Sequence, residues 1–367
     1  MFVADKRSDD PTVHVIPRSF IRKLAGFVFA TENFINTDWI LKTEEFKQAD
    51  IIHCHNLHGR FFNLRTLQKM SLLKPVMWTL HDEWALTPHC AYTLQGTAMK
   101  NGLYVCPSKD TQPRILWDNT THLAAEKNDI YAQSKLTVIT PSHWLEERAR
   151  ATSLSAQKII HIPNGIDTEI FSPGDKTEAR KKLGLPLDKK ILLFLANDAR
   201  KNTWKGWVYA EKVIANLKDD PTTVCVCVGD HMAADEEKSA GNIINRGYIK
   251  NSEEIRDYYR AADGLLFTSL AENFPLVILE AMSCGLPIVS FDIGGVAEAV
   301  THMKNGYISA YCDSDALTAG AQWLLKLSPI ERQAMGIENS KKVRESFTQE
   351  QMYEKYMKVY NELDQKK

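Results

Sequence analysis

The stretch that decides the fold is Ser269-Leu-Ala-Glu-Asn-Phe-Pro-Leu-Val-Ile-Leu-Glu-Ala-Met-Ser-Cys-Gly-Leu-Pro-Ile-Val-Ser-Phe-Asp-Ile-Gly-Gly295. It follows a short apolar run, residues 264–268, of the kind that is buried in parallel sheets. Pro275 suits the first turn of a helix, where its missing N–H costs nothing, and Gly285 is placed to end that helix. Residues 288–291 then form the next apolar run. The stretch therefore predicts a strand–helix–strand unit of a parallel sheet.

Two carboxylates flank the predicted helix start. Glu272 lies in the loop and Glu280 more than one turn inside the helix, so the two can lie on the order of 10 Å apart at 1.5 Å rise per residue. In open parallel sheets, ligands bind outside the carboxyl ends of the strands, where a helix start offers N–H groups to an anion. A diphosphate fits that position. Each glutamate alone is more simply explained as an ordinary loop or surface carboxylate, but the surrounding pattern favours a sugar-nucleotide site.

The segment from Glu272 to Glu280 resembles the paired-glutamate motif of retaining glycosyltransferases of family 4, which have the GT-B architecture. Other segments agree with this resemblance. Residues 163–171 are similar to the segment that closes the first domain in that family, and residues 294–298 are similar to its second phosphate-side loop. Residues 52–58 and 78–90 resemble a subgroup that builds capsular polysaccharide or exopolysaccharide.

The resemblance implies an α/β fold of GT-B architecture, with two Rossmann-like doubly wound domains facing a cleft. Residues 1–171 would form the acceptor-side domain, residues 172–345 the nucleotide-sugar-binding domain, and residues 346–367 a helix that crosses back to the first domain. The chain has 367 residues, of which 44% are apolar, and this is enough for two cores. Apolar runs that read as strands lie at 12–16, 51–52, 76–80, 136–140, 159–162, 190–195 and 223–229.

Basic residues follow the predicted strand 190–195. Breaking a sugar–phosphate bond leaves negative charge on the diphosphate, and a fixed cation there lowers the barrier. Arg200 and Lys205 have the spacing of the Arg and Lys pair that the family uses on the diphosphate, which implies the same role here. In the family this pair usually follows its strand directly, whereas residues 197–199 intervene here, so Lys201 is an alternative to Arg200. A solvated basic loop is the other explanation of this cluster.

The resemblance also implies how the donor is held. Glu272 would position the donor sugar and Glu280 would hold the ribose. His81 follows an apolar strand and would touch the sugar from the opposite domain, with Asp82 orienting its imidazole; a structural role explains His81 equally well. The phosphates would be held by loop amides, those of Asn273, Phe274, Pro275, Leu276, Gly294 and Gly295. The base would be held by Tyr248 and Ile249, in the segment before a predicted helix at 252–262.

The composition narrows the functional classes. A net charge of −1, and the lack of a basic run interleaved with aromatic residues, argue against nucleic-acid binding. Seven scattered cysteines and a start without a signal-like apolar core predict a cytoplasmic protein without a disulfide framework. Residues 18–29 mix basic and apolar side chains in a partly helical rhythm, which permits peripheral contact with the inner face of the membrane. The alternative is a core-facing helix with a solvated basic edge.

No metal and no cofactor are predicted. On a strand, His53 and His55 share a face while Cys54 points to the opposite one, which argues against a shared metal. Cys90 and Cys106 have no complete four-ligand set between them. The predicted partners are a nucleotide-sugar donor and a saccharide or lipid-linked acceptor.

Compared with the family, the chain begins at what resembles the second strand, so about one strand–helix unit is missing. The first strand of a doubly wound sheet lies in its middle, and its loss would leave neighbouring strands without partners. We therefore expect a damaged or rearranged first domain. Three explanations stay open: a true start upstream of Met1, a strand supplied by another segment or chain, or a protein that binds the donor without transferring it.

The sequence thus predicts a retaining glycosyltransferase that moves a hexose from a nucleotide diphosphate sugar to a polysaccharide or lipid-linked oligosaccharide. A nucleotide-sugar epimerase on the same architecture and a truncated, inactive nucleotide-sugar-binding protein are the alternatives.

Overall fold

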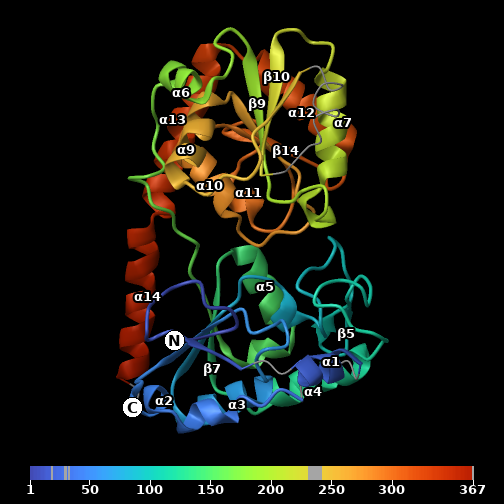
Figure 1. Cartoon of the computed structure of the whole chain (residues 1–367), viewed down its shortest axis with the longest axis vertical. Helices are drawn as coiled ribbons and strands as arrows, with labels where there is room; N and C mark the ends of the chain where they lie inside the picture. The colour runs from blue at the N-terminus through green and yellow to red at the C-terminus, as the bar shows by residue number, and fades with distance from the viewer. Residues whose placement is uncertain (18–19, 29–30, 32–33, 230–241, 366–367) are drawn as a thin grey trace. The chain divides into compact units, whose positions relative to one another are not determined.

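The structure is a computed structural model that describes residues 1–17, 20–28, 31, 34–229 and 242–365 (Figure 1). The chain divides into two compact units, of which the first comprises Met1–Ile162 with Lys355–Lys367 and the second comprises Pro163–Glu354. Each unit has its own parallel sheet and its own buried core. The predicted α/β class with parallel sheets is therefore confirmed.

The first unit is built on a four-stranded sheet in the order β3-β4-β7-β8, in which all neighbours are parallel. Its strands are β3 Ile52–His55, β4 Val76–Thr79, β7 Leu136–Thr140 and β8 Lys158–His161. Its helices before the last are α1 Phe20–Val28, α2 Glu44–Gln48, α3 Leu64–Leu73, α4 Thr120–Ala132 and α5 His143–Ala151, with 3₁₀ turns at Asp38–Lys42, Trp84–Leu86 and Ser153–Ala156. The core that they share is centred on Trp78 and Tyr131, both fully buried.

The predicted strand at residues 12–16 is shorter than expected and does not join the four-stranded sheet. β2, His14–Val15, pairs with β1, Phe2–Val3, in a separate two-stranded parallel sheet. The N–H of His14 donates to the carbonyl of Met1 and the N–H of Ile16 to that of Val3, so the hydrogen bonds of this segment go to the start of the chain. A small antiparallel hairpin, β5 Met99–Lys100 with β6 Leu103–Tyr104, lies elsewhere in this unit.

The second unit is built on a six-stranded, fully parallel sheet in the order β11-β10-β9-β12-β13-β14. The strands β10, β12 and β13 of this sheet are fully buried, as expected for strands covered on both faces, whereas the edge strand β11 is partly buried. The strands are β9 Lys190–Leu195, β10 Thr223–Val228, β11 Ile243–Asn245, β12 Gly264–Phe267, β13 Ile288–Phe291 and β14 Gly306–Ser309.

Helices cover both faces of this sheet (Figure 1). One face packs against α6 Lys176–Leu183, α9 Ser252–Ala261, α10 Leu276–Ser283 and α13 Pro329–Ser346, with the short α11 Val296–Ala299 beside them. The other face packs against α7 Trp207–Leu217 and α12 Ser314–Lys326. In this second unit, β12, α10 and β13 follow one another as the predicted strand–helix–strand stretch. Pro275 is the N-cap of α10 rather than a residue of its first turn, and Gly285 follows the helix with a φ of +81°.

The last helix, α14 Gln349–Asp364, begins in the second unit and ends in the first. In the first unit its Tyr356 hydroxyl lies 3.0 Å from Thr79 Oγ1, and Val359 and Leu363 are buried. Residues 163–171, predicted from the sequence to end the first domain, belong to the second unit by their contacts, and Phe171 is part of its core. None of the helices in the described residues is both long enough and apolar enough to cross a membrane.

Candidate functional site

Three loops of the second unit lie at the carboxyl ends of neighbouring strands. They follow β9, β12 and β13, and the parallel pairing of these strands sets the loops along one edge of the sheet. These loops carry most of the residues that the sequence predicted for the donor site. Ligands of open parallel sheets bind at this edge, so the position fits the prediction.

Lys205 and Glu272 form an ion pair, with 2.7 Å between Nζ and Oε1. The loop that carries Lys205 is held to the loop that carries Glu272 by two hydrogen bonds. The N–H of Leu270 donates to the carbonyl of Trp204 at 2.7 Å, and the Thr268 hydroxyl donates to the carbonyl of Lys205 at 2.9 Å. The two side chains are 32% and 19% exposed, so both remain accessible from solvent.

Gly206 makes this contact between loops possible. Its φ is +66°, and a Cβ atom there would lie 1.9 Å from the carbonyl oxygen of Thr268. A residue with a side chain would both strain the backbone and push the two loops apart.

Gly294 holds the same loop from the other side. Its φ is +52°, and a Cβ atom there would lie 1.9 Å from the carbonyl oxygen of Glu272. The N–H of the next residue, Gly295, donates to the carbonyl of Asn273 at 2.7 Å. The Gly295 amide is thus already bonded within the protein, and its contact with a phosphate stays a prediction. The two glycines fix the backbone that presents Glu272.

The start of α10 supplies the remaining amides. Pro275 carries no N–H, so this member of the predicted loop cannot donate to a phosphate. The N–H groups of Leu276 and the next residue lie in the first helical turn, where no helical carbonyl precedes them to accept. Phe274 is buried, and its carbonyl accepts from the Asn164 side chain at 2.9 Å. Anion binding here would therefore depend on the first turn of α10.

Glu280 lies inside α10, with one carboxylate oxygen engaged. The hydroxyl of Tyr259, on α9, donates to Oε2 at 2.9 Å. Burial raises the pKa of Glu280, and the hydrogen bond from Tyr259 acts in the opposite direction. Burial also raises the pKa of the Tyr259 hydroxyl well above its usual value, so Tyr259 stays a donor. Tyr259 was not predicted from the sequence, because nothing in the spacing of α9 indicates which residue faces α10.

Arg200 lies between β9 and the 3₁₀ turn at Thr203–Lys205, with its guanidinium 4.5 Å from the ring centre of Trp207. Lys201, the alternative to Arg200, is exposed. Tyr248 and Ile249, predicted for the base, precede α9; Tyr248 is 54% exposed and Ile249 packs against the core. The roles of Arg200, Tyr248 and Ile249 stay predictions.

His81 belongs to the first unit, where it pairs with a second histidine. His81 Nε2 lies 2.9 Å from His55 Nδ1, and the two rings are stacked. Asp82 does not make the predicted hydrogen bond to His81: its Oδ2 lies 2.7 Å from His58 Nε2, and its Oδ1 accepts from the N–H of Trp84. The side chain that orients His81 is therefore His55, because the turn after β4 directs Asp82 toward His58.

Both paired histidines are neutral at neutral pH. Burial lowers the pKa of His81, against the charge of Asp82, and burial with the neighbouring His81 lowers the pKa of His55 to about 4. In a neutral pair, one nitrogen of the 2.9 Å contact donates and the other accepts. The pair can thus hold one ring in a fixed tautomer.

The neighbouring His53 is engaged at both ring nitrogens. Nδ1 lies 2.6 Å from the Tyr360 hydroxyl and Nε2 lies 2.8 Å from Thr79 Oγ1. Near the hairpin, the N–H of Cys90 donates to Cys106 Sγ at 3.2 Å. Within the described part of the chain, no group of three or more His, Cys, Asp or Glu side chains is placed to hold a metal ion.

Comparison with known proteins gives the family. Residues 2–170 match the family model Glycosyltransferase Family 4, and residues 175–343 match the family model Glycosyl transferases group 1. This chain belongs to the group 1 and family 4 glycosyltransferases. The predicted GT-B architecture of two Rossmann-like domains is confirmed by its fold and its structural neighbours.

Three similar proteins illustrate the match. The glycosyltransferase is 24% identical over 338 residues to the putative colanic acid biosynthesis glycosyl transferase WcaC of Escherichia coli K12, covering 85% of this chain and 76% of that protein. It is 34% identical over 166 residues to the putative teichuronic acid biosynthesis glycosyltransferase TuaC of Bacillus subtilis, covering 45% and 40%. The crystal structure of Anabaena HepE in complex with UDP-glucose superposes with a TM-score of 0.66 at 18% identity, covering 96% of this chain and 86% of that one.

Proposed function

We propose that this glycosyltransferase moves a hexose, with retention of anomeric configuration, from a nucleotide diphosphate sugar to a polysaccharide or a lipid-linked oligosaccharide. The observation that carries the proposal is the Lys205–Glu272 ion pair at the carboxyl edge of the second sheet. It joins the cation proposed for the diphosphate to the carboxylate proposed for the sugar.

The chemistry follows from this geometry. Lys205 would turn from Glu272 to the diphosphate, where its charge offsets the negative charge that develops as the sugar–phosphate bond breaks. Arg200 would assist it, so that no metal is needed. Glu272, released from the ion pair, would accept hydrogen bonds from the sugar hydroxyls. The first turn of α10 would donate to the phosphates.

The ribose is assigned to Glu280. Tyr259 occupies one oxygen of this carboxylate, which leaves the other to accept from a ribose hydroxyl. The base would lie against Tyr248 and Ile249, and His81 would touch the sugar from the first domain. The stacked His55 would fix the orientation of His81.

The acceptor class is proposed from the relatives. The names of WcaC and TuaC refer to colanic acid and teichuronic acid biosynthesis, both of which are polysaccharides. The HepE structure holds UDP-glucose, so this donor is the first to test.

A membrane contact is also proposed, through residues 18–29. Residues 18, 19 and 29 of this segment lie outside the described residues, but α1 exposes apolar side chains instead of burying them in the core. Trp117 lies beside α1, where its indole N–H donates to the carbonyl of Val28 at 2.8 Å. The exposed apolar residues of this surface are Phe20, Ile21, Leu24, Val28, Leu116 and Trp117. The sequence of the segment also mixes basic residues with the apolar ones, which favours contact with an anionic lipid surface.

The test of the donor site is a thermal-shift panel with UDP, GDP, ADP and dTDP on the full chain. Ligands that bind only the folded state raise its stability. One nucleotide should stabilise the protein, and Lys205→Ala should lose that shift while the exposed control Lys212→Ala on α7 keeps it. A shift that survives Lys205→Ala would contradict the assignment of the diphosphate.

The test of the reaction uses the matching sugar nucleotide with an oligosaccharide acceptor. Transfer with the donor's anomeric configuration, read by proton NMR, supports the proposal. Conversion of the donor sugar without an acceptor would identify an epimerase. Tight binding with no turnover, unchanged when residues are added upstream of Met1, would identify an inactive binding protein.

A further inference from the structure

The second unit contains a cavity of about 680 Å³ that the proposed function does not use. It lies at the edge of the sheet where the strands begin, since Lys190, Asp263 and Pro287 line it at the starts of β9, β12 and β13. The cavity is therefore at the opposite end of β12 from Glu272. Helices α6 and α13 contribute its other main walls.

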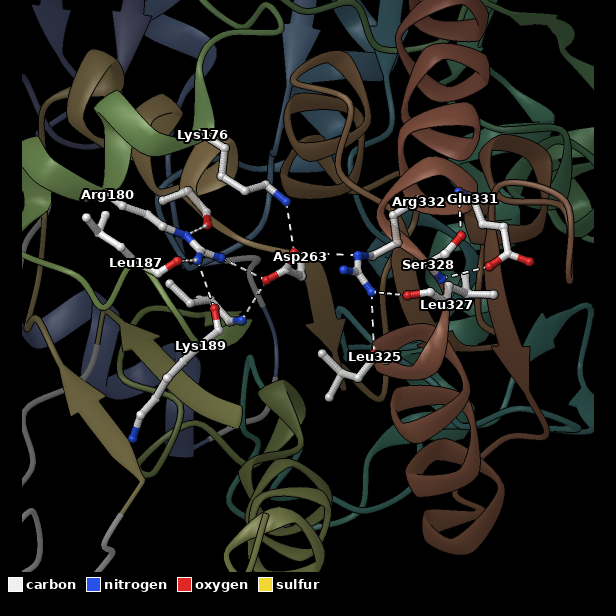
Figure 2. Close-up of polar contacts among 12 residues, drawn as sticks. Lys176, Arg180, Leu187, Lys189, Asp263, Leu325, Leu327, Ser328, Glu331 and Arg332 are labelled. Atoms are coloured by element: carbon white, nitrogen blue, oxygen red, sulfur yellow. Dashed lines mark hydrogen bonds and ion pairs between the residues drawn. The ribbon is translucent and has the colours of Figure 1, made fainter. Parts of the chain in front are cut away.

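Three cations converge on one carboxylate in this cavity (Figure 2). Lys176 Nζ and Arg180 Nη2 each lie 2.8 Å from an oxygen of Asp263, and Arg332 Nε lies 3.5 Å from it. Asp263 also accepts from the N–H of Ile191 at 2.8 Å, so its oxygens are fully engaged. The Asp263 side chain is 6% exposed. The cluster has three positive charges and one negative charge.

Arg180 has a structural role. Besides Asp263, its guanidinium donates to four backbone carbonyls, those of Ala261, Pro186, Leu187 and Lys189. All of its nitrogens are bonded within the protein. Arg180 and Asp263 thus tie α6 to the starts of β9 and β12, and this pair alone is electrically balanced.

Arg332 is different. Its Nη1 donates to the carbonyls of Leu325 and Leu327 and its Nε faces Asp263, but its Nη2 has no partner among the described residues. The side chain is only 11% exposed, and the residue lines the cavity. Lys176, 44% exposed at the cavity, keeps two N–H groups beyond its bond to Asp263. Two cationic side chains that can donate hydrogen bonds, Lys176 and Arg332, therefore face the same cavity.

The excess positive charge of this cluster favours the binding of an anion. Like charges held close together in a partly buried site repel, and an oxyanion that accepts from both offsets this repulsion. A guanidinium and an ammonium are the side chains that bind phosphate groups most strongly. The volume lies within the range of about 300–1,000 Å³ that is typical of small-molecule sites, so a phosphate carried on a sugar can enter.

We propose that this cavity binds a phosphate group, free or carried as a monoester on a sugar, between Lys176 and Arg332. The site is separate from the donor loops, and the proposal does not depend on the proposed function.

The experiment is isothermal titration of the full chain at low ionic strength with inorganic phosphate and, separately, with glucose 6-phosphate. Lys176→Gln and Arg332→Gln should each weaken binding by about tenfold, because each removes one charge-assisted contact. The matched control is Lys181→Gln, since Lys181 lies on the same helix but pairs with Glu178 at 2.8 Å. Lys205→Ala, which alters the donor loop, should leave binding unchanged. Lys176→Gln keeps the test valid if Arg332→Gln unfolds.

The outcomes separate the explanations. Tighter binding of glucose 6-phosphate than of inorganic phosphate supports a sugar-phosphate ligand, and the reverse order supports the free ion. Equal weakening in Lys181→Gln would show a bulk charge effect, and loss in Lys205→Ala would place the anion in the donor loop; either result overturns the proposal. Absence of binding for both probes also overturns it.

Discussion

Gly294 combines a φ of +52° with a backbone carbonyl 1.9 Å from where its Cβ would lie. Gly294→Ala should therefore lower the free energy of unfolding by about 2–4 kcal/mol, from backbone strain and overpacking together. The matched control is Gly184→Ala, where φ is +61° but nothing lies within 4 Å of the added Cβ. That variant should lose only the strain, about 1 kcal/mol. Urea denaturation of both variants checks the difference, and equal losses would contradict the packing argument.

Glu280 is a second position where one substitution is informative. Because burial raises its pKa, the folded protein disfavours the charged form, and this penalty is present above the folded pKa and absent below the unfolded value of 4.5. Glu280→Gln should stabilise the protein at pH 7.5, by up to about 1 kcal/mol, and lose that advantage near pH 4. It should weaken nucleotide binding by about tenfold, because a charged acceptor is lost.

Thermal unfolding of the wild type and of Glu280→Gln, at pH 7.5 and near pH 4, checks the expected change in stability. Nucleotide titration of the same two proteins checks the expected loss of binding. Tyr259→Phe is the control that removes the hydrogen bond and keeps the carboxylate. A Glu280→Gln protein that is less stable at pH 7.5 would contradict the argument.

For single residues, the spacing within a short segment of sequence predicted site positions, whereas contacts between distant segments could not be predicted. The interval from Glu272 to Glu280 and the position of Lys205 could be read from the chain, since each depends on a short segment beside a strand. The hydrogen bond of Glu280 to Tyr259, and that of Asp82 to His58, depend on how elements pack, so the sequence identified neither.

Strand β3 carries histidines whose protonation opposes folding. Burial lowers the pKa of His53 to about 3 and that of His55 to about 4, against 6.5 in the unfolded chain. Below pH 6.5 the unfolded state therefore binds more protons, and stability falls as pH decreases toward 4. At pH 5 each histidine should cost on the order of 1 kcal/mol, allowing for solvent screening of these partly exposed rings.

Urea denaturation at pH 7.5 and pH 5 measures this slope. His55→Gln should reduce it, and His122→Gln, at an exposed position on α4, serves as the control. An unchanged slope in His55→Gln would contradict the assignment.

Most elements could be predicted because their signals are local. The buried runs of β9, β10, β12 and β13 are continuous apolar segments, and the end of α10 is marked by Gly285. The segment at 12–16 was predicted as a strand of the first domain's main sheet, which was wrong, because an apolar run specifies a strand but not the strand with which it pairs. Here the partner is the start of the chain itself.

The whole molecule has separate cores in its two units, which predicts two unfolding transitions. A nucleoside diphosphate without a sugar has its proposed contacts in the second unit only. At about 100 times its dissociation constant it should stabilise one transition by roughly 2.7 kcal/mol and leave the other in place. Differential scanning calorimetry of the full chain checks this.

Two variants identify the transitions. Asp263→Asn, in the second unit, should lower the one that the nucleotide raises, whereas His55→Gln should affect the other. A nucleotide that raises both equally, or a single transition throughout, would contradict independent unfolding of the units.

Gly206 has a consequence for the genetics of this protein. Each base change in a glycine codon that is not synonymous adds a side chain or ends the chain, and a Cβ at this position meets the carbonyl oxygen of Thr268 at 1.9 Å. In a randomly mutagenised library selected for activity, codon 206 should therefore retain synonymous changes alone. Codon 212 encodes the exposed Lys212 of α7, six positions further along the chain, and should by contrast collect substitutions freely.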